Sequence, residues 1–139
     1  MRIVLDTNVI ISGLLSPYGK PAQIMRMVSS GDITLCFDAR IFTECQEVLL
    51  RPKFEFNKEK VRVLLTQIKY MGEIVATVPL KESLPDPDDN PFLEAAIAGN
   101  VKFLVSGNIN HFPKKLCQNI EVLSPSDFLK EYINSKDAT

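Results

Sequence analysis

Residues 2–15 have the sequence RIVLDTNVIISGLL, and this stretch indicates the fold most strongly. Arg2–Leu5 is a short apolar run of the kind that forms a buried strand. Asp6, Thr7 and Asn8 then open a segment, Val9–Leu15, whose apolar positions suit a helix. The first strand therefore ends at an acidic residue. In an open α/β sheet the carboxyl ends of the strands are where ligands bind, so Asp6 stands in a favourable place for a functional group.

Strand-like and helix-like segments alternate along the rest of the chain. Further strands are expected at Ile33–Phe37, Ile74–Val78, Lys102–Val105 and Glu121–Leu123. Helices are expected at Pro21–Ser30, Ala39–Arg51, between Asn57 and Gly72, at Pro91–Ala98 and at Ser124–Ile133. This alternation predicts a three-layer α/β/α sandwich with a mainly parallel central sheet. The length of the chain suits one domain, residues 1–139.

Composition and charge argue against a largely disordered chain, a membrane-spanning helix and a disulfide framework. Apolar residues make up 45% of the chain and charged residues 24%, which is ordinary globular usage. Sixteen basic and seventeen acidic side chains give a net charge of −1, so any contact with nucleic acid has to come from a local patch. No apolar run approaches the roughly 20 residues of a transmembrane helix. Cys36, Cys45 and Cys117 are odd in number and lie in apolar surroundings, which indicates reduced core thiols and a cytoplasmic location.

Asp6 and Glu44 are the first two candidate catalytic acids. The alternative explanation of Asp6 is that it, or Asn8, caps the following helix. Glu44 shares a row of its helix with Ile41 and Val48, so its carboxylate borders the apolar stripe, where a charge needs a partner. The alternative for Glu44 is a rim position with the carboxylate in water.

The segment 85–91 supplies a third acid. Asp86, Asp88 and Asp89 lie within four residues, and no basic residue occurs between Lys81 and Lys102. Their repulsion has to be relieved by protonation, by water or by a cation. Asp89 or Asn90 can also cap the next helix, so a purely structural role is open.

A polar turn follows the expected strand at Lys102–Val105. Ser106 and Asn108, separated by Gly107, can offer oxygens to a metal ion or to its bound waters. Serine and asparagine are also common in turns, and the turn explanation is open for this triplet.

Four segments, in this order, resemble the PIN domain family: VLDTNVIISGLL, IFTECQEVLLRPKF, DPDDNPFLEAAIAGNVKFLVSGNINHF and IEVLSPSDFL. Many members are the ribonuclease toxins of toxin–antitoxin pairs. The resemblance implies an endoribonuclease that uses Mg²⁺ or Mn²⁺ to hydrolyse single-stranded RNA, an antitoxin partner, and in many members a homodimer. It places the acids at Asp6, Glu44 and Asp89, with Asp86 as the alternative in the same loop, and supporting polar groups at Asn8 and Ser12.

This chain departs from the family pattern at one position. Many members carry a fourth acid in a TGD-like turn, where this sequence has Ser106, Gly107 and Asn108. The amide leaves open whether one metal ion or two would bind. Carboxylates suit hard cations, and two ions roughly 3.5–4 Å apart can activate a water and stabilise the leaving oxygen. The resemblance implies products with a 5′-phosphate and a 3′-hydroxyl.

Basic and aromatic residues follow the helix that carries Glu44. Arg51, Lys53 and Lys58 are candidate RNA contacts, interleaved with Phe54 and Phe56. The alternative is a solvated helix face with the phenylalanines in the core.

His111, the single histidine, is interpreted as structural because no serine or cysteine nucleophile accompanies it.

Two other interpretations of the whole chain stay open. Besides the nuclease, a catalytically weak PIN-like domain that binds RNA or protein is an alternative, motivated by Asn108. A receiver-like signalling domain would need paired acids after the first strand, which DTN does not supply.

Overall fold

Five parallel strands form one sheet in the computed structural model, which describes residues 1–137. They are β1 (Arg2–Leu5), β2 (Thr34–Phe37), β3 (Glu73–Ile74), β4 (Phe103–Val105) and β5 (Glu121–Leu123). Their order across the sheet is β3-β2-β1-β4-β5. The expected parallel sheet is therefore confirmed, with β1 at its centre and the acid Asp6 at the carboxyl end of that strand.

Six helices surround this sheet. They are α1 (Thr7–Leu15), α2 (Lys20–Ser29), α3 (Ala39–Leu49), α4 (Lys58–Met71), α5 (Asn90–Ala98) and α6 (Pro125–Asp137). Four 3₁₀ turns, η1 (Pro52–Phe54), η2 (Pro87–Asp89), η3 (Ile109–His111) and η4 (Lys114–Leu116), lie between them.

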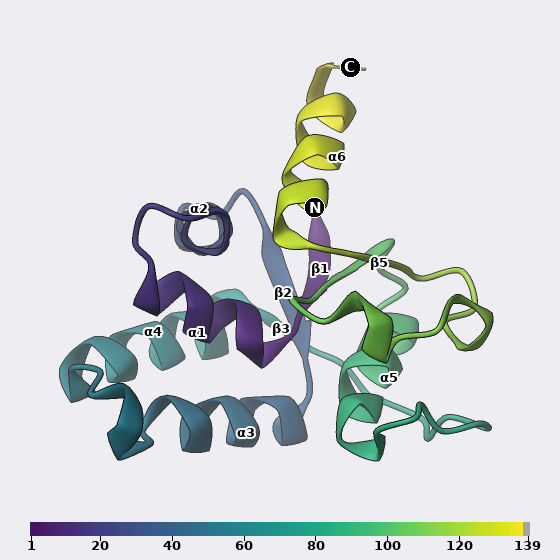
Figure 1. Cartoon of the computed structure of the whole chain (residues 1–139), viewed down its shortest axis with the longest axis horizontal. Coiled ribbons are helices and arrows are strands. Elements are labelled where there is room, and N and C mark those ends of the chain that lie inside the picture. Colours follow the sequence, from purple (N-terminus) through teal and green to yellow (C-terminus); the bar gives the residue numbers. More distant parts are fainter. Residues whose placement is uncertain (138–139) are drawn as a thin grey trace.

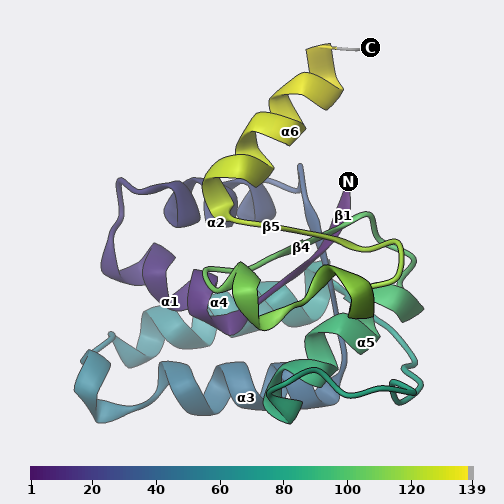
Figure 2. The ribbon, with the colours of Figure 1, turned by 45° about the vertical axis from the view of Figure 1, so that its right-hand side comes forward.

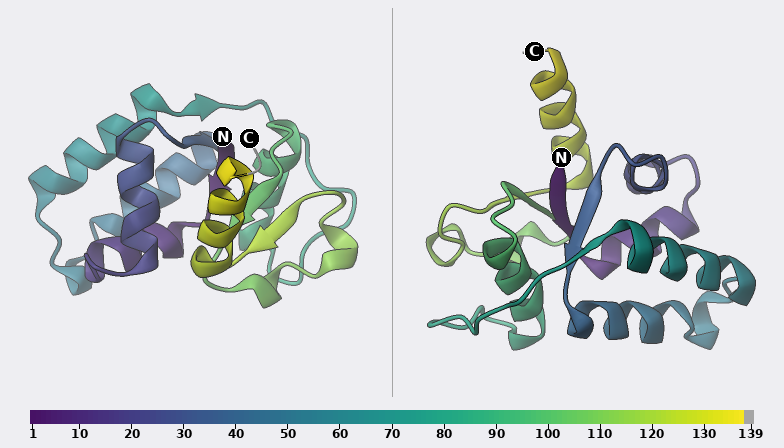
Figure 3. Two further views of the ribbon diagram at one scale, coloured as in Figure 1. Left: turned by 90° about the horizontal axis from the view of Figure 1, so that it is seen from above. Right: turned by 180° about the vertical axis from the view of Figure 1, so that it is seen from behind.

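The helices cover both faces of the sheet. Helix α5 contacts β1, β2 and β4 on one face, while α4 contacts β2, and α6 contacts β4, β5 and α2, on the other (Figure 1). The chain first adds β2 and β3 on one side of β1 and then passes to the other side of β1 to form β4. Because connections between parallel strands are right-handed, a connection in this reversed direction crosses the opposite face of the sheet. The segment between β3 and α5 follows this course (Figure 3, right). The predicted three-layer sandwich is confirmed.

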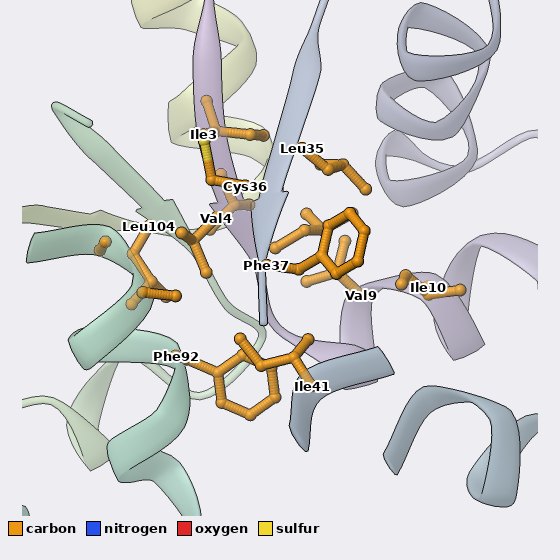
Figure 4. Close-up of a cluster of buried hydrophobic side chains, with 14 of the residues drawn as sticks. Ile3, Val4, Val9, Ile10, Leu35, Cys36, Phe37, Ile41, Phe92 and Leu104 are labelled. Carbon is orange, nitrogen blue, oxygen red and sulfur yellow. The ribbon is translucent and has the colours of Figure 1, made fainter. Parts of the chain in front are cut away.

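Apolar side chains of the three central strands pack on both faces of the sheet and form the core. Leu35 and Phe37 lie on the side of α1, whereas Leu104 lies on the side of α5 with Phe92 (Figure 4). The central strands are almost entirely buried, as expected of strands covered on both faces. The three cysteines are buried and free, which confirms their interpretation as core thiols.

The prediction for the third strand was wrong in position and length. Residues Ile74–Val78 were expected, but only Glu73 and Ile74 pair with β2, opposite Cys36 and Phe37. The ladder stops there because β2 ends at Phe37 and the chain turns into α3. The turn before β3 needs glycine, since a Cβ at Gly72 would lie 2.6 Å from the backbone oxygen of Ile68.

Helix α6 is longer than predicted. It was expected to end at Ile133 but continues to Asp137, and its second half extends away from the body of the protein (Figure 2). None of the helices within residues 1–137 combines the length and the apolar character needed to cross a membrane.

Candidate acidic site

Asp6 is buried at the end of β1, with 7% of its surface exposed. It occupies the position before α1, yet its side chain forms no capping hydrogen bond. Instead Oδ2 accepts hydrogen bonds from Ser106 Oγ at 2.8 Å and from Asn8 Nδ2 at 3.4 Å. The side chain of Asp6 is therefore held mainly by the side chains of Ser106 and Asn8. Burial raises the pKa of this carboxyl, and the negative charge of Asp89 acts in the same direction.

Glu44 faces the same region from α3. Its carboxylate is half-buried, and Oε2 accepts a hydrogen bond from Thr7 Oγ1 at 2.8 Å. Because Thr7 directly follows Asp6, this bond brings α3 to the end of β1. Burial raises the pKa of Glu44, and the charges of Asp6 and Asp88 raise it further. The Glu44 carboxylate, at the border of the apolar stripe, therefore has a polar partner in Thr7 and is not free in solvent.

The structure separates the two candidates for the third acid. Asp86 is exposed, and its Oδ1 accepts the backbone N–H of Asp88 at 2.9 Å, a local bond within the loop. Asp89 is partly buried, and its Oδ2 lies 3.2 Å from Nδ1 of His111. Asp89 forms no capping bond to α5. Burial raises its pKa, and the charges of Asp86 and Glu44 add to that effect.

The supporting polar residues differ in what they contact. Ser106 is fully buried; besides its bond to Asp6, its Oγ accepts the backbone N–H of Asn108 at 2.9 Å. Asn8 Oδ1 accepts the N–H of Gly107 at 3.1 Å. The turn after β4 is therefore tied to the DTN segment. Ser12 is exposed on α1, and within residues 1–137 it forms no hydrogen bond to the acids.

Two further residues belong to this site: Thr7 was not singled out in the sequence, and His111 was interpreted as structural. Thr7 orients Glu44, and His111 holds Asp89 from the turn after β4. The sequence carried a weak signal for each, because Thr7 lies between two candidate residues and His111 lies three positions after Asn108. Local patterns alone could not show that these side chains meet acids 37 and 22 positions away.

The acids Asp6, Glu44 and Asp89 form what we call the acidic site. In the part of the chain that the structure describes, no lysine or arginine lies within ion-pair distance of any of them, and His111 is the basic side chain in contact with the site. Each of the three pKa values is raised partly by another acid of the same region. The donor set, carboxylate and hydroxyl oxygens, suits a hard divalent cation. Among residues 1–137, however, no three acidic, histidine or cysteine side chains stand close enough to hold a metal ion as they are.

A second group of buried acids lies close by and was also missed. Arg40 binds Asp38 through Nε at 2.8 Å and Glu94 through Nη1 at 2.8 Å. Thr77 donates to Asp38 at 3.2 Å, and Leu80 N–H donates to Glu94 at 3.0 Å. We call Asp38, Arg40 and Glu94 the paired site. Burial alone would raise the pKa of Asp38, but the hydrogen bonds from Arg40 and Ile41 lower it below its ordinary value.

The candidate RNA contacts lie at the end of α3 and the start of α4. Arg51, Lys53 and Lys58 are exposed, and Arg51 lies 3.9 Å from Glu47. Lys53 Nζ stands 5.0 Å from the centre of the Phe54 ring. The positive charge of Arg51 acts on Glu44, where it opposes the rise in pKa. This basic segment is therefore electrostatically connected to the acidic site.

Comparisons with known proteins agree with this architecture. The PIN domain family matches residues 2–110. An uncharacterized protein of Methanocaldococcus jannaschii, MJ1680, is 25% identical over 95% of this chain and 92% of its own length. The crystal structure of FitAcB from Neisseria gonorrhoeae is similar in fold, with a TM-score of 0.55 and 17% identity over 90% of this chain and 98% of that chain.

Proposed function

This chain belongs to the PIN domain family, and we propose that it is a metal-dependent endoribonuclease that cleaves single-stranded RNA at the acidic site. The observation that carries the proposal is the meeting of three acids from three separate segments at the carboxyl end of β1 without a lysine or arginine in ion-pair contact within residues 1–137. Such an arrangement is unfavourable by itself, and a bound cation relieves it. PIN domains typically use divalent metals, and we propose Mg²⁺ or Mn²⁺ here.

In this proposal Asp6, Glu44 and Asp89 hold the metal, and their neighbours orient them. Ser106 Oγ and Asn8 Nδ2 occupy one oxygen of Asp6, which leaves Oδ1 for a ligand. Thr7 and His111 constrain Glu44 and Asp89 in the same way. Because the acids within residues 1–137 are not close enough to form a metal site as they stand, their side chains have to move on binding. A bound divalent ion would supply an activated water and neutralise charge on the phosphodiester.

The test uses the purified chain and a short single-stranded RNA. We expect cleavage with Mg²⁺ or Mn²⁺, products with a 5′-phosphate and a 3′-hydroxyl, and no cleavage in EDTA. Asp6→Asn should abolish cleavage and leave the circular dichroism spectrum unchanged. Asp32→Asn, a change of the same charge at an exposed loop position, is the matched control and should cleave as the wild type does. Cleavage that persists in EDTA, or in Asp6→Asn, rejects this function.

A second candidate function is a PIN-like domain that binds RNA or protein without cutting RNA. Two observations favour it: the amide of Asn108 where many members have an acid, and the absence of a ready metal site within residues 1–137. A binding-only chain would retard RNA in a gel and leave it intact at every metal concentration.

We also propose a toxin role, with an antitoxin as the partner. The support is the family itself and the likeness in fold to FitAcB. If this role is right, expression of the wild-type chain alone should stop cell growth and expression of Asp6→Asn should not. Homodimer formation stays a prediction, which sedimentation of the purified chain would test.

A further inference from the structure

Positive charge collects where the chain passes from α3 through η1 into α4. Arg51, Lys53, Lys58 and Lys60 are all exposed, and we call them the basic surface. Within residues 1–137, Lys53, Lys58 and Lys60 form no ion pair, and Arg51 has only the long contact to Glu47. Glu55 and Glu59 are exposed in the same segment, and Glu59 pairs with Arg62. Residues 51–62 carry five basic and two acidic side chains, a net charge of +3, whereas the whole chain carries −1, so the positive charge is local. Unpaired ammonium groups on one surface attract a polyanion.

The basic surface lies at the end of the helix that carries an acid of the acidic site. Glu44 and Leu49, the last residue of α3, are five positions apart, which is about 7.5 Å of helix rise. A strand with one phosphate at the acidic site can therefore continue along α3 and meet the basic surface with the phosphates that follow.

The same region offers places for bases. A cavity of about 390 Å³ opens between the end of α1 and the start of α4, and it is lined by apolar residues such as Leu14 and Phe56 and by one acidic and one basic residue, Glu55 and Lys60. Tyr18, next to Pro17 in the chain, is fully exposed. A tyrosine that buries no surface contributes nothing to the core. Exposed aromatic rings beside ammonium groups are the usual combination in single-strand binding.

We propose that the basic surface, with Tyr18 and this cavity, binds single-stranded RNA and guides it to the acidic site. Lys53, Lys58 and Lys60 contact phosphates, and Tyr18 stacks on a base. The inference rests on the proposed function for the identity of the nucleic acid, but it concerns binding, which is measured without cleavage.

The first experiment compares two triple variants made in the same Asp6→Asn background. Lys53→Ala, Lys58→Ala and Lys60→Ala remove the three ammonium groups of the basic surface. Lys69→Ala, Lys102→Ala and Lys130→Ala are the control, because these lysines are also exposed and the change in charge is identical. Fluorescence anisotropy of a labelled single-stranded RNA in EDTA reports the affinity as a function of salt.

Each phosphate contact on a single strand contributes about 0.7 to the slope of log K against log salt. We therefore expect the basic-surface triple to lower the slope by about 2 and the affinity at low salt at least tenfold. The control triple should keep the slope of its parent. Equal losses in both triples, or no loss in the first, overturn the proposal. A first triple that binds RNA normally but loses affinity for a protein partner also overturns it.

A second experiment tests the base contact. Tyr18→Ala should weaken RNA binding by roughly five- to a hundredfold, the range of one lost aromatic stack. Tyr70→Ala is the control, because Tyr70 is also largely exposed, at 77%, and lies near the other end of α4. Equal affinities for Tyr18→Ala and its parent overturn the role of Tyr18.

The outcomes separate this inference from the proposed function. If the wild type binds RNA through the basic surface and never cleaves it with Mn²⁺, the nuclease proposal fails and the binding surface stands. If the wild type cleaves RNA and the basic-surface triple binds as tightly as its parent, the nuclease stands and the surface is wrong.

Discussion

The paired site and the acidic site each bring acidic side chains close together, but an arginine neutralises their charge only in the paired site. In the paired site, Arg40 binds both Asp38 and Glu94, and the pKa of Asp38 lies below its ordinary value. In the acidic site, the pKa values of Asp6, Glu44 and Asp89 all lie above theirs, because burial and neighbouring acids act together.

This difference separates a structural role from a functional one. A carboxylate that an arginine neutralises holds helices α3 and α5 together, and nothing more is required to explain it. Acids that are kept together without such a partner reduce stability, and a perturbed group of this kind marks a candidate functional site. The positions of the acids along the chain cannot make the distinction, since each site has one acid directly after a strand and one on a helix.

The largest expected effect concerns the third acid. Asp89→Asn should abolish Mn²⁺-dependent cleavage, whereas Asp86→Asn should keep most of it, because Asp86 is exposed and bonded within its own loop. RNA cleavage by the two variants, which differ from the wild type by the same charge, checks this expectation. Loss of activity in Asp86→Asn with a fully active Asp89→Asn would reverse the assignment.

The next effect is on stability at the paired site. Arg40→Met leaves Asp38 and Glu94 buried without a cation. A fully buried broken pair costs about 3–5 kcal/mol, and we expect roughly 2–3 kcal/mol here because the guanidinium is half-exposed. Urea unfolding measures it. Arg40→Lys should recover only part of the loss, since its ammonium lacks the planar fork of donors with which the guanidinium contacts both acids. An Arg40→Met variant as stable as the wild type would show that the pairing contributes nothing.

A smaller effect is expected at the residues that orient the acids. His111→Ala and Thr7→Val should weaken Mn²⁺ binding by roughly 10–100-fold, the usual cost of losing a group that orients a metal ligand. The rise in melting temperature as Mn²⁺ is added reports the affinity without any cleavage. Ser12→Ala should have no effect, because Ser12 makes no contact with the acids within the described residues. Equal Mn²⁺ affinity in all three variants contradicts the proposed roles of Thr7 and His111.

The smallest effect is the dependence of stability on pH without metal. A raised pKa in the folded state means that folding favours the protonated acid, so the acidic site should reduce stability as the pH rises above the ordinary carboxyl pKa. Asp38, with its lowered pKa, should lose its contribution as the pH falls below that value. Urea unfolding of Asp6→Asn in EDTA should therefore show a gain over the wild type at pH 8 that shrinks toward pH 4. A gain that is constant with pH contradicts the assignment.

Much of this architecture was predictable from local pattern. The strands that end at Leu5, Phe37 and Val105 were placed within a residue or two, because continuous apolar runs between turns leave few alternatives. The third strand was misplaced, since its β-branched residues satisfy strand propensity whether or not a partner strand is present. Its two paired residues depend on where β2 ends, which lies outside the local sequence.

The sequence by itself determined the alternation of strands and helices, the position of Asp6 at a strand end, and the family motifs, because all of these are read from neighbours along the chain. Only the tertiary structure decided which acids are neutralised. Arg40 is four positions before Glu44 on one helix, yet it pairs with Asp38 and with Glu94 from α5. The physical reason is that the charge state of a buried carboxylate depends on the groups within a few ångströms of it, and in a folded chain these come from distant segments.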